Sequence, residues 1–141
     1  MRRILIADDN RANQVVVAGV LNKLGHQAEI VDDGDAAVRA CAAEEFDAVL
    51  MDVMMPGMDG YQATRAIRAH EAALRLEPVP IIGLSARALP SDRQIALDAG
   101  MNDYITKPLR TSALEEVLYR WLTPPTKVAS EPPDEAGERR T

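Results

Sequence analysis

Five short apolar runs alternate along the chain with stretches of helical periodicity, and this alternation restricts the fold more than any other feature. The runs cover residues 4–7, 28–31, 48–51, 81–84 and 104–106. They are too short for helices and rich in Ile, Val and Leu, which is typical of strands buried on both faces. Strict alternation of strand and helix predicts right-handed crossovers and a parallel sheet covered by helices on both faces. The sequence therefore predicts an α/β fold.

The segments between the runs show the spacing and the end signals of helices. Apolar residues recur at helical spacing in the first of these segments, at Val17, Val20, Leu21 and Leu24. Gly25 and Gly100 occupy positions where helices are expected to end. Pro90 suits the first turn of a helix, where the missing N–H is no loss.

The chain divides into a folded part and a tail. Its length of 141 residues indicates one domain. The periodic pattern stops near Leu122, and beyond it prolines stand among charged and small residues without an apolar face. We expect a domain over residues 1–122 and a disordered tail or linker over residues 123–141.

Composition excludes several classes of protein. No apolar run approaches the roughly 20 residues of a membrane span, so we expect no membrane contact by this domain. The lone Cys41 allows neither an internal disulfide nor a cysteine-built zinc site, and it fits a cytoplasmic location. A net charge of -6 argues against nucleic acid as a partner.

Polar residues follow all five predicted strands, although the second leads only into a less distinctive Asp32-Asp33-Gly34 turn. Asp8 and Asp9 follow the first, and Asp52, Ser85 and Lys107 follow the third, fourth and fifth. Each has an ordinary structural reading on its own, as a helix cap, a loop hydroxyl or a surface charge. In an open parallel sheet, however, the carboxyl ends of the strands meet at the edge where ligands bind. The joint pattern therefore predicts one functional site.

The charges of this predicted site indicate its chemistry. Three carboxylates and one ammonium leave a net charge of −3 + 1 = −2, which raises the pKa of at least one acid. Mg²⁺ offsets that charge, since it is a hard cation that takes carboxylate oxygens and is commonly completed by phosphate. A carboxylate nucleophile with Mg²⁺, a Lys and a hydroxyl is equipped for phosphoryl transfer. Asp52 is the predicted nucleophile.

These residues resemble the receiver domain of two-component response regulators over nearly the whole chain apart from the tail. The motifs are the Asp8-Asp9 pair, "MDVMMPGMDG", "LSA" and "DAGMNDYITKPL". The stretch "DDNRAN" is similar to receivers fused to hybrid histidine kinases. The resemblance implies a flavodoxin-like fold with strand order 2-1-3-4-5. It also implies a histidine kinase or a histidine phosphotransfer protein as partner, and it leaves open a dimer that forms on phosphorylation.

The resemblance also implies a role for each site residue. Asp52 would be the phosphoryl acceptor in a phosphorelay, taking the group from a phosphohistidine in its own Mg²⁺-dependent reaction. The ion would be held by Asp8, Asp9, Asp52 and the backbone carbonyl of Met54. Ser85 and Lys107 would contact the phosphoryl oxygens, and Tyr104 would be the aromatic residue that changes rotamer on activation. Such a domain is a signalling switch with slow autodephosphorylation rather than an enzyme.

Three other functions fit this sequence less well. A phosphatase of the haloacid-dehalogenase type needs a second Asp two residues after the nucleophile, where this chain has Met54. A flavin or nucleotide module needs a phosphate-cradling loop after the first strand, where the acidic pair would repel phosphate without a metal. A receiver that has lost phosphorylation would lack a site residue, and none is missing.

Overall fold

A computed structural model describes residues 2–86, 89–107 and 109–122 of the chain. Strands and helices alternate in the order β1 (Arg3–Ala7), α1 (Arg11–Lys23), β2 (Gln27–Val31), α2 (Gly34–Ala43), β3 (Ala48–Asp52), α3 (Gly60–Leu74), β4 (Ile81–Ser85), α4 (Pro90–Ala99), β5 (Asp103–Thr106) and α5 (Thr111–Leu122). The predicted tail at 123–141 lies outside the described residues. Among the described helices, none combines the length and the apolar character that crossing a bilayer requires.

The five strands form one parallel sheet in the order β2-β1-β3-β4-β5, which confirms the predicted topology. Each strand is one residue longer than predicted. Two of the added residues are Asp52 and Ser85, which were expected just after their strands and are in fact the last residues of β3 and β4. They are part of the ladder because Asp52 is paired with Leu84, and Ser85 with Thr106.

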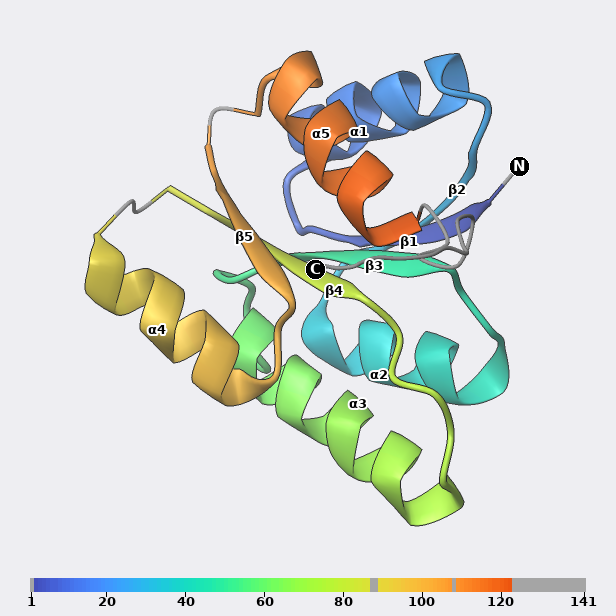
Figure 1. Ribbon diagram of the computed structural model, residues 1–141, viewed down its shortest axis with the longest axis vertical. Coiled ribbons are helices and arrows are strands. Elements are labelled where there is room, and N and C mark those ends of the chain that lie inside the picture. The colour runs from blue at the N-terminus through green and yellow to red at the C-terminus, as the bar shows by residue number, and fades with distance from the viewer. Residues whose placement is uncertain (1, 87–88, 108, 123–141) are drawn as a thin grey trace, which may run out of the picture.

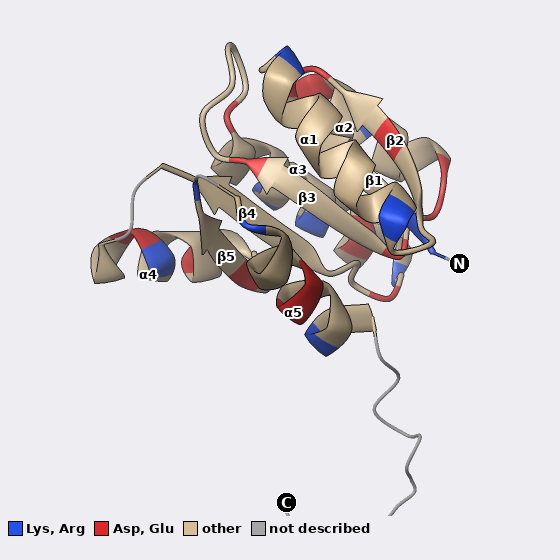
Figure 2. Cartoon of the chain, turned by 90° about the horizontal axis from the view of Figure 1, so that it is seen from above, with Lys and Arg blue, Asp and Glu red and all other residues tan. Residues whose placement is uncertain are grey.

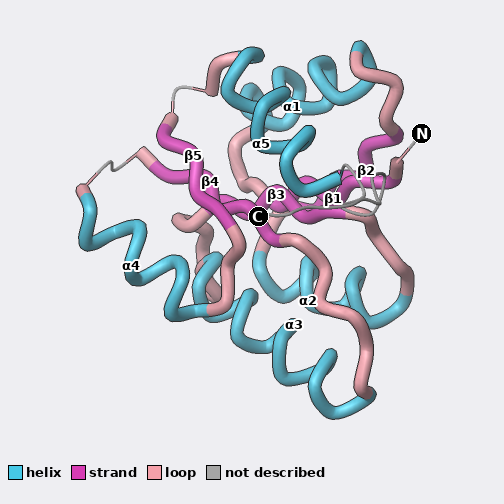
Figure 3. Tube along the Cα trace, in the orientation of Figure 1, coloured by secondary structure: helices cyan, strands magenta, loops and turns pink. Residues whose placement is uncertain are grey.

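Two helical layers enclose the sheet, with α1 and α5 on one face and α2, α3 and α4 on the other (Figures 1 and 3). Successive residues of a strand point to opposite faces. Ile4 and Ile6 of β1 accordingly pack under α1 and α5, while Leu5 and Ala7 pack against the other layer. The core is thus split into two clusters, one on each side of the sheet.

The prediction of strands buried on both faces holds for the inner strands and is wrong for β2. The residues of β3 and β4 are all buried, and those of β1 are buried after Arg3. Those of β2 are half-buried or exposed. The physical reason is position, since β2 lies at the edge of the sheet, where β1 is its one partner among the described strands.

Local signals in the sequence fix the helix ends. The side chains of Asn10, Asp33 and Asp59 cap α1, α2 and α3 by accepting hydrogen bonds from backbone N–H groups. Gly25 and Gly100 follow α1 and α4 with φ of +86° and +110°, which confirms the predicted helix ends.

Gly60 lets α3 begin directly beneath the end of β3. A Cβ at this position would overlap the backbone carbonyl of Asp52. The amide N–H of Gly60 donates to the carbonyl of Val53 at 2.9 Å, which ties the start of the helix to the residue after the strand. The Asp59-Gly60 pair in the sequence therefore packs the end of β3 closely against α3.

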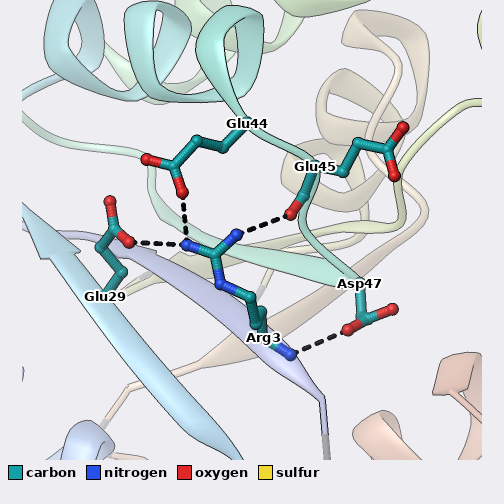
Figure 4. Close-up of polar contacts among 5 residues, drawn as sticks. All are labelled: Arg3, Glu29, Glu44, Glu45 and Asp47. Carbon is teal, nitrogen blue, oxygen red and sulfur yellow. Dashed lines mark hydrogen bonds and ion pairs between the residues drawn. The ribbon is translucent and has the colours of Figure 1, made fainter.

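Arg3 clamps the opposite, amino-terminal edge of the sheet (Figure 4). Its guanidinium donates to Glu29 of β2 at 2.9 Å, to Glu44 and to the carbonyl of Glu45, while its backbone N–H donates to Asp47 at 2.8 Å. Because exposed ion pairs contribute little individually, the main consequence is geometric. These bonds hold β1 in register between β2 and the start of β3.

Candidate functional site

The structure brings the three predicted carboxylates together at the carboxyl edge of the sheet. Asp8 follows β1, Asp52 ends the neighbouring β3, and Asp9 lies beside them. One carboxylate oxygen from each lies within 4.8 Å of the others. Asp8 and Asp52 are buried, whereas Asp9 is exposed. Asp9 is therefore the carboxylate of the cluster that is most accessible to solvent.

Asp8 holds one carboxylate oxygen ready for a ligand. Its Oδ1 accepts a hydrogen bond from the backbone N–H of Asn10 at 2.8 Å. Its Oδ2 is buried and has no hydrogen-bond partner among the described residues. Buried polar atoms are normally satisfied, so such an oxygen needs a counterpart. Three converging carboxylates with an unsatisfied oxygen fit a hard divalent cation such as Mg²⁺.

Lys107 supplies a positive charge to the cluster. Its Nζ lies 3.1 Å from Oδ2 of Asp52 and 3.8 Å from Oδ2 of Asp8. The backbone N–H of Lys107 donates to the carbonyl of Ser85 at 2.6 Å, which anchors the residue to the end of β4. The second oxygen of Asp52 accepts from the backbone N–H of Met54 at 3.2 Å. Both oxygens of Asp52 are therefore oriented by neighbours.

The pKa of Asp52 is raised above that of an ordinary aspartate. Burial of the carboxyl is the largest cause, and the charge of Asp8 acts in the same direction. The Lys107 ammonium and the Met54 N–H oppose the shift without cancelling it. Burial contributes more to this shift than the negative charge counted from the sequence, and a bound cation would oppose it.

The remaining predicted residues lie close to this edge. Ser85 is buried at the end of β4, one position beyond the residue that pairs with Asp52. Met54 follows β3 with its side chain largely exposed, at 71%. The sulfur is therefore not packed in the site, and only the backbone of Met54 contacts Asp52 among the described interactions.

Tyr104 is half-buried in β5 and packs against the core cluster beneath α2, α3 and α4. It pairs with Gly83 of β4, where a Cβ would lie 3.3 Å from Cδ1 of the ring. Burial, together with the neighbouring Tyr104 hydroxyl and the Asp92 carboxylate, raises the pKa of Tyr61. The ring of Tyr104 thus lies on the side of α3, in space that a side chain at position 83 would restrict.

Sequence reasoning missed Gln14, a buried amide beside the site. Its Nε2 donates to the backbone carbonyl of Asp8 at 2.6 Å and to Oδ1 of Asp32 at 2.8 Å. A signal was present, because residue 14 precedes Val17 and Leu21 by three and seven positions and so shares their buried face. A polar residue at such a position needs partners.

Asp103, the residue before Tyr104, was also missed, and its side chain connects β5 with α4 and α5. Its carboxylate accepts from Arg120 Nη1 at 2.6 Å and from Trp121 Nε1 at 2.9 Å, both on α5, and Arg93 of α4 lies at 3.5 Å. Charges of both signs are interspersed on α4 and α5 (Figure 2). The signal in the sequence was a carboxylate that begins an otherwise apolar strand.

Comparison with known proteins agrees with this geometry. The family model described as "Response regulator receiver domain" matches residues 4–119. Sensor protein GacS of Pseudomonas syringae pv. syringae is 46% identical over 119 residues, which is 84% of this chain and 13% of that protein. The chain thus spans a small part of this curated relative.

Two solved structures are similar over most of the domain. The receiver domain of sensor histidine kinase PA1611 from Pseudomonas aeruginosa PAO1 has a magnesium ion in its active-site cleft. It is 46% identical, with a TM-score of 0.77 over 86% of this chain and 97% of that one. The receiver domain of Saccharomyces cerevisiae Ssk1, solved with the histidine phosphotransfer protein Ypd1, is 29% identical, with a TM-score of 0.82 over 85% and 88%. The chain therefore belongs to the response regulator receiver domain family of two-component signalling proteins.

Proposed function

We propose that Asp52 accepts a phosphoryl group from a phosphohistidine donor and that the phosphorylated domain then acts as a switch in a phosphorelay. The observation that carries this proposal is the convergence of Lys107, Asp8 and Asp52 around one buried carboxylate oxygen that accepts no hydrogen bond from the described residues. A nucleophile, a fixed cation and acidic metal ligands in one place are the parts that phosphoryl transfer requires.

Mg²⁺ is the proposed cofactor, supported by the ion in the PA1611 receiver domain. Asp8, Asp9 and Asp52, with the backbone carbonyl of Met54, would hold it, because three carboxylate oxygens already lie within 4.8 Å of one another. When bound, the ion neutralises charge on the transferred group. Its charge would also oppose the rise in the pKa of Asp52, which burial causes in the main and the charge of Asp8 increases.

The proposed phosphoryl transfer uses the side chains of Asp52, Lys107 and Ser85. A carboxylate oxygen of Asp52 forms a bond to phosphorus while the bond from phosphorus to the donor imidazole nitrogen breaks. The nitrogen keeps the bonding electron pair, and a donor ring protonated on its other nitrogen leaves as neutral imidazole. Lys107, 3.1 Å from Asp52, is placed to stabilise charge on the phosphoryl oxygens, and the hydroxyl of Ser85 is proposed to donate to one of them.

The proposed donor is a histidine kinase or a histidine phosphotransfer protein, supported by the complex of the Ssk1 receiver with Ypd1. Val15 and Val16 on α1 are 62% and 54% exposed. A pocket of about 190 Å³ at this surface is lined by Asn13, Val16, Val17, Lys107 and Leu109. This surface would let an apolar face of the donor dock next to Lys107 and bring its phosphohistidine to Asp52.

We further propose that the domain is a switch and not an enzyme with turnover. The acyl phosphate would be lost by slow hydrolysis, and while it persists a partner or a second copy of the domain would bind the surface of α4, β5 and α5. That partner is proposed to be a protein and not a nucleic acid, given the net charge of -6. We place the reaction in the cytoplasm, where the free thiol of Cys41 would stay reduced.

Acetyl phosphate, a small donor that needs no kinase, tests the acceptor. With Mg²⁺ present, intact-mass measurement should show one added phosphate on the wild-type protein. The phosphate should be absent from Asp52→Asn and after chelation of the metal, and present in Asp35→Asn, which removes an exposed carboxylate on α2. An equal yield from Asp52→Asn would show that the acceptor has been assigned wrongly.

A further inference from the structure

Gln14 is a buried amide whose contacts reach the acidic loop from the helix that follows it. Only 6% of the residue is exposed. Its Nε2 donates at 2.6 Å to the backbone carbonyl of Asp8 and at 2.8 Å to Oδ1 of Asp32. An amide nitrogen has two hydrogens, so both are used. Gln14 thereby ties the ends of β1 and β2 to the first turn of α1.

The hydrogen bond from Gln14 fixes the carbonyl of Asp8, a residue whose N–H and carboxylate are already hydrogen-bonded. The N–H of Asp8 donates to the carbonyl of Val31 at 3.2 Å, and its Oδ1 accepts from the N–H of Asn10 at 2.8 Å. Its carbonyl is held by Gln14. With these three groups fixed, Oδ2 remains as the buried oxygen without a hydrogen bond among the described residues. The direction of that oxygen therefore depends on the backbone that Gln14 holds.

The bond to Asp32 has a second consequence. Asp32 follows β2 and is a further carboxylate near the same edge of the sheet. Among the described residues, however, the cluster of converging oxygens consists of Asp8, Asp9 and Asp52. Oδ1 of Asp32 is instead directed to Gln14. One side chain thus holds a neighbouring carboxylate in a fixed place while it orients Asp8.

We propose that Gln14 is a positioning residue for the divalent cation, acting through the backbone of Asp8 and through Asp32. This inference rests on the proposed metal site and adds a residue that does not touch the ion. Partners that orient a metal ligand through a hydrogen bond typically contribute about tenfold to 100-fold in metal affinity.

Gln14→Glu separates positioning from simple electrostatics, because the two effects change affinity in opposite directions. Glu has nearly the same shape but cannot donate to the carbonyl of Asp8 or to the carboxylate of Asp32. Its added negative charge, taken alone, would attract a cation more strongly. If Gln14 positions Asp8, Mg²⁺ should bind about tenfold more weakly to the variant, measured by calorimetry on the full chain. Unchanged or tighter binding would overturn the proposal.

A charge-matched exchange gives a second test. Gln14→Glu with Asp32→Asn has the wild-type net charge, and the Asn amide can donate to the new Glu, which favours folding. The carbonyl of Asp8 still lacks its donor, so Mg²⁺ should remain more weakly bound than in the wild type. Return to wild-type affinity would contradict the role through Asp8. In the metal-free protein, the NMR signal of the Asn10 N–H, which reports the Asp8 carboxylate, should shift in both variants and stay unmoved if Gln14 is only structural.

Two controls keep this inference distinct from the proposed function. Gln27→Glu makes the same substitution at an exposed position on the opposite edge of the sheet, and its Mg²⁺ affinity should equal that of the wild type. Asp9→Asn removes a proposed ligand. If the wild type fails to bind Mg²⁺, or if Asp9→Asn binds it equally well, the proposed metal site is wrong. If both behave as expected and Gln14→Glu binds Mg²⁺ as the wild type does, only the role of Gln14 is wrong.

Discussion

The indole N–H of Trp121 donates a 2.9 Å hydrogen bond to the carboxylate of Asp103, the residue directly before Tyr104. The only tryptophan of the chain is therefore hydrogen-bonded to the first residue of β5. Arg120 and Arg93 contact the same carboxylate from α5 and α4. A movement of Tyr104 would therefore displace the neighbouring Asp103, whose carboxylate connects β5 with α4 and α5, the three elements of the proposed switch surface.

Trp121 should report on activation. Beryllofluoride with Mg²⁺ is a stable substitute for the phosphoryl group on Asp52. Its binding should change the fluorescence of Trp121, because displacement of Tyr104 alters the neighbouring Asp103. The response should be lost in Tyr104→Ala, and Phe at the same position should retain part of it. A full response in Tyr104→Ala would show that the signal reaches Trp121 by another path.

Asp103 should make the free energy of unfolding of the domain decrease at low pH. Burial alone would raise its pKa, but hydrogen bonds from Trp121 and from the Tyr104 N–H, with the charge of Arg120, hold that pKa below the ordinary value. A lowered acid pKa stabilises the fold above the unfolded-state value of about 3.9, and this contribution is lost as the pH falls through the folded-state pKa. Asp103→Asn should therefore cost about 2 kcal/mol at pH 7 and less in acid.

Urea unfolding of both proteins from pH 7 to pH 3 measures this difference in the free energy of unfolding. A difference that stays constant over the whole range would contradict the assignment to the charged carboxylate. Asp98→Asn, an exposed change on α4, serves as the control and should show little pH-dependent difference.

The ionised carboxylate of Asp52 should affect the free energy of unfolding in the opposite direction to that of Asp103. Burial and Asp8 raise its pKa, so the ionised carboxylate destabilises the metal-free fold. That cost is fully present above the folded-state pKa and disappears as the pH falls below the unfolded-state value. Asp52→Asn should therefore raise the free energy of unfolding by about 1 kcal/mol at pH 7 with chelator present.

With saturating Mg²⁺ the wild type should become more stable than Asp52→Asn, because a ligand stabilises a folded protein only where the binding site is intact. Thermal unfolding with and without the metal checks both signs. If Asp52→Asn is less stable than the wild type in chelator, the raised pKa of Asp52 is contradicted. If Mg²⁺ stabilises both proteins equally, Asp52 is not a ligand of the metal.

Activation should perturb α4, β5 and α5 and leave the far side of the domain largely unchanged. NMR shifts caused by beryllofluoride should concentrate in residues 89–100 and 103–118, since a population shift between two packed arrangements needs no large movement of the backbone. Ser85→Ala should weaken these shifts by removing the proposed hydroxyl contact. Perturbations confined to α1 and α2, with Tyr104 unaffected, would contradict this switch.

The sequence by itself determined which segments form strands and helices, where most helices begin and end, and which residue types gather after the strands. These are local properties, because side-chain periodicity, caps and glycines with positive φ act over a few residues. The acidic pair, Asp52, Ser85 and Lys107 could be placed at one edge because parallel strands all point their carboxyl ends the same way. The strand order itself came from the resemblance to receiver domains and not from periodicity.

Only the tertiary structure decided the features that depend on distances between segments far apart in the chain. The half-exposed β2 follows from its position at the sheet edge, and the seat of Tyr104 depends on its register with Gly83. The bonds of Gln14 to Asp8 and Asp32, and those of Asp103 to α5, join different elements. Local patterns carry no information on such distances, because a hydrogen bond forms only where packing of the two layers brings donor and acceptor to about 3 Å.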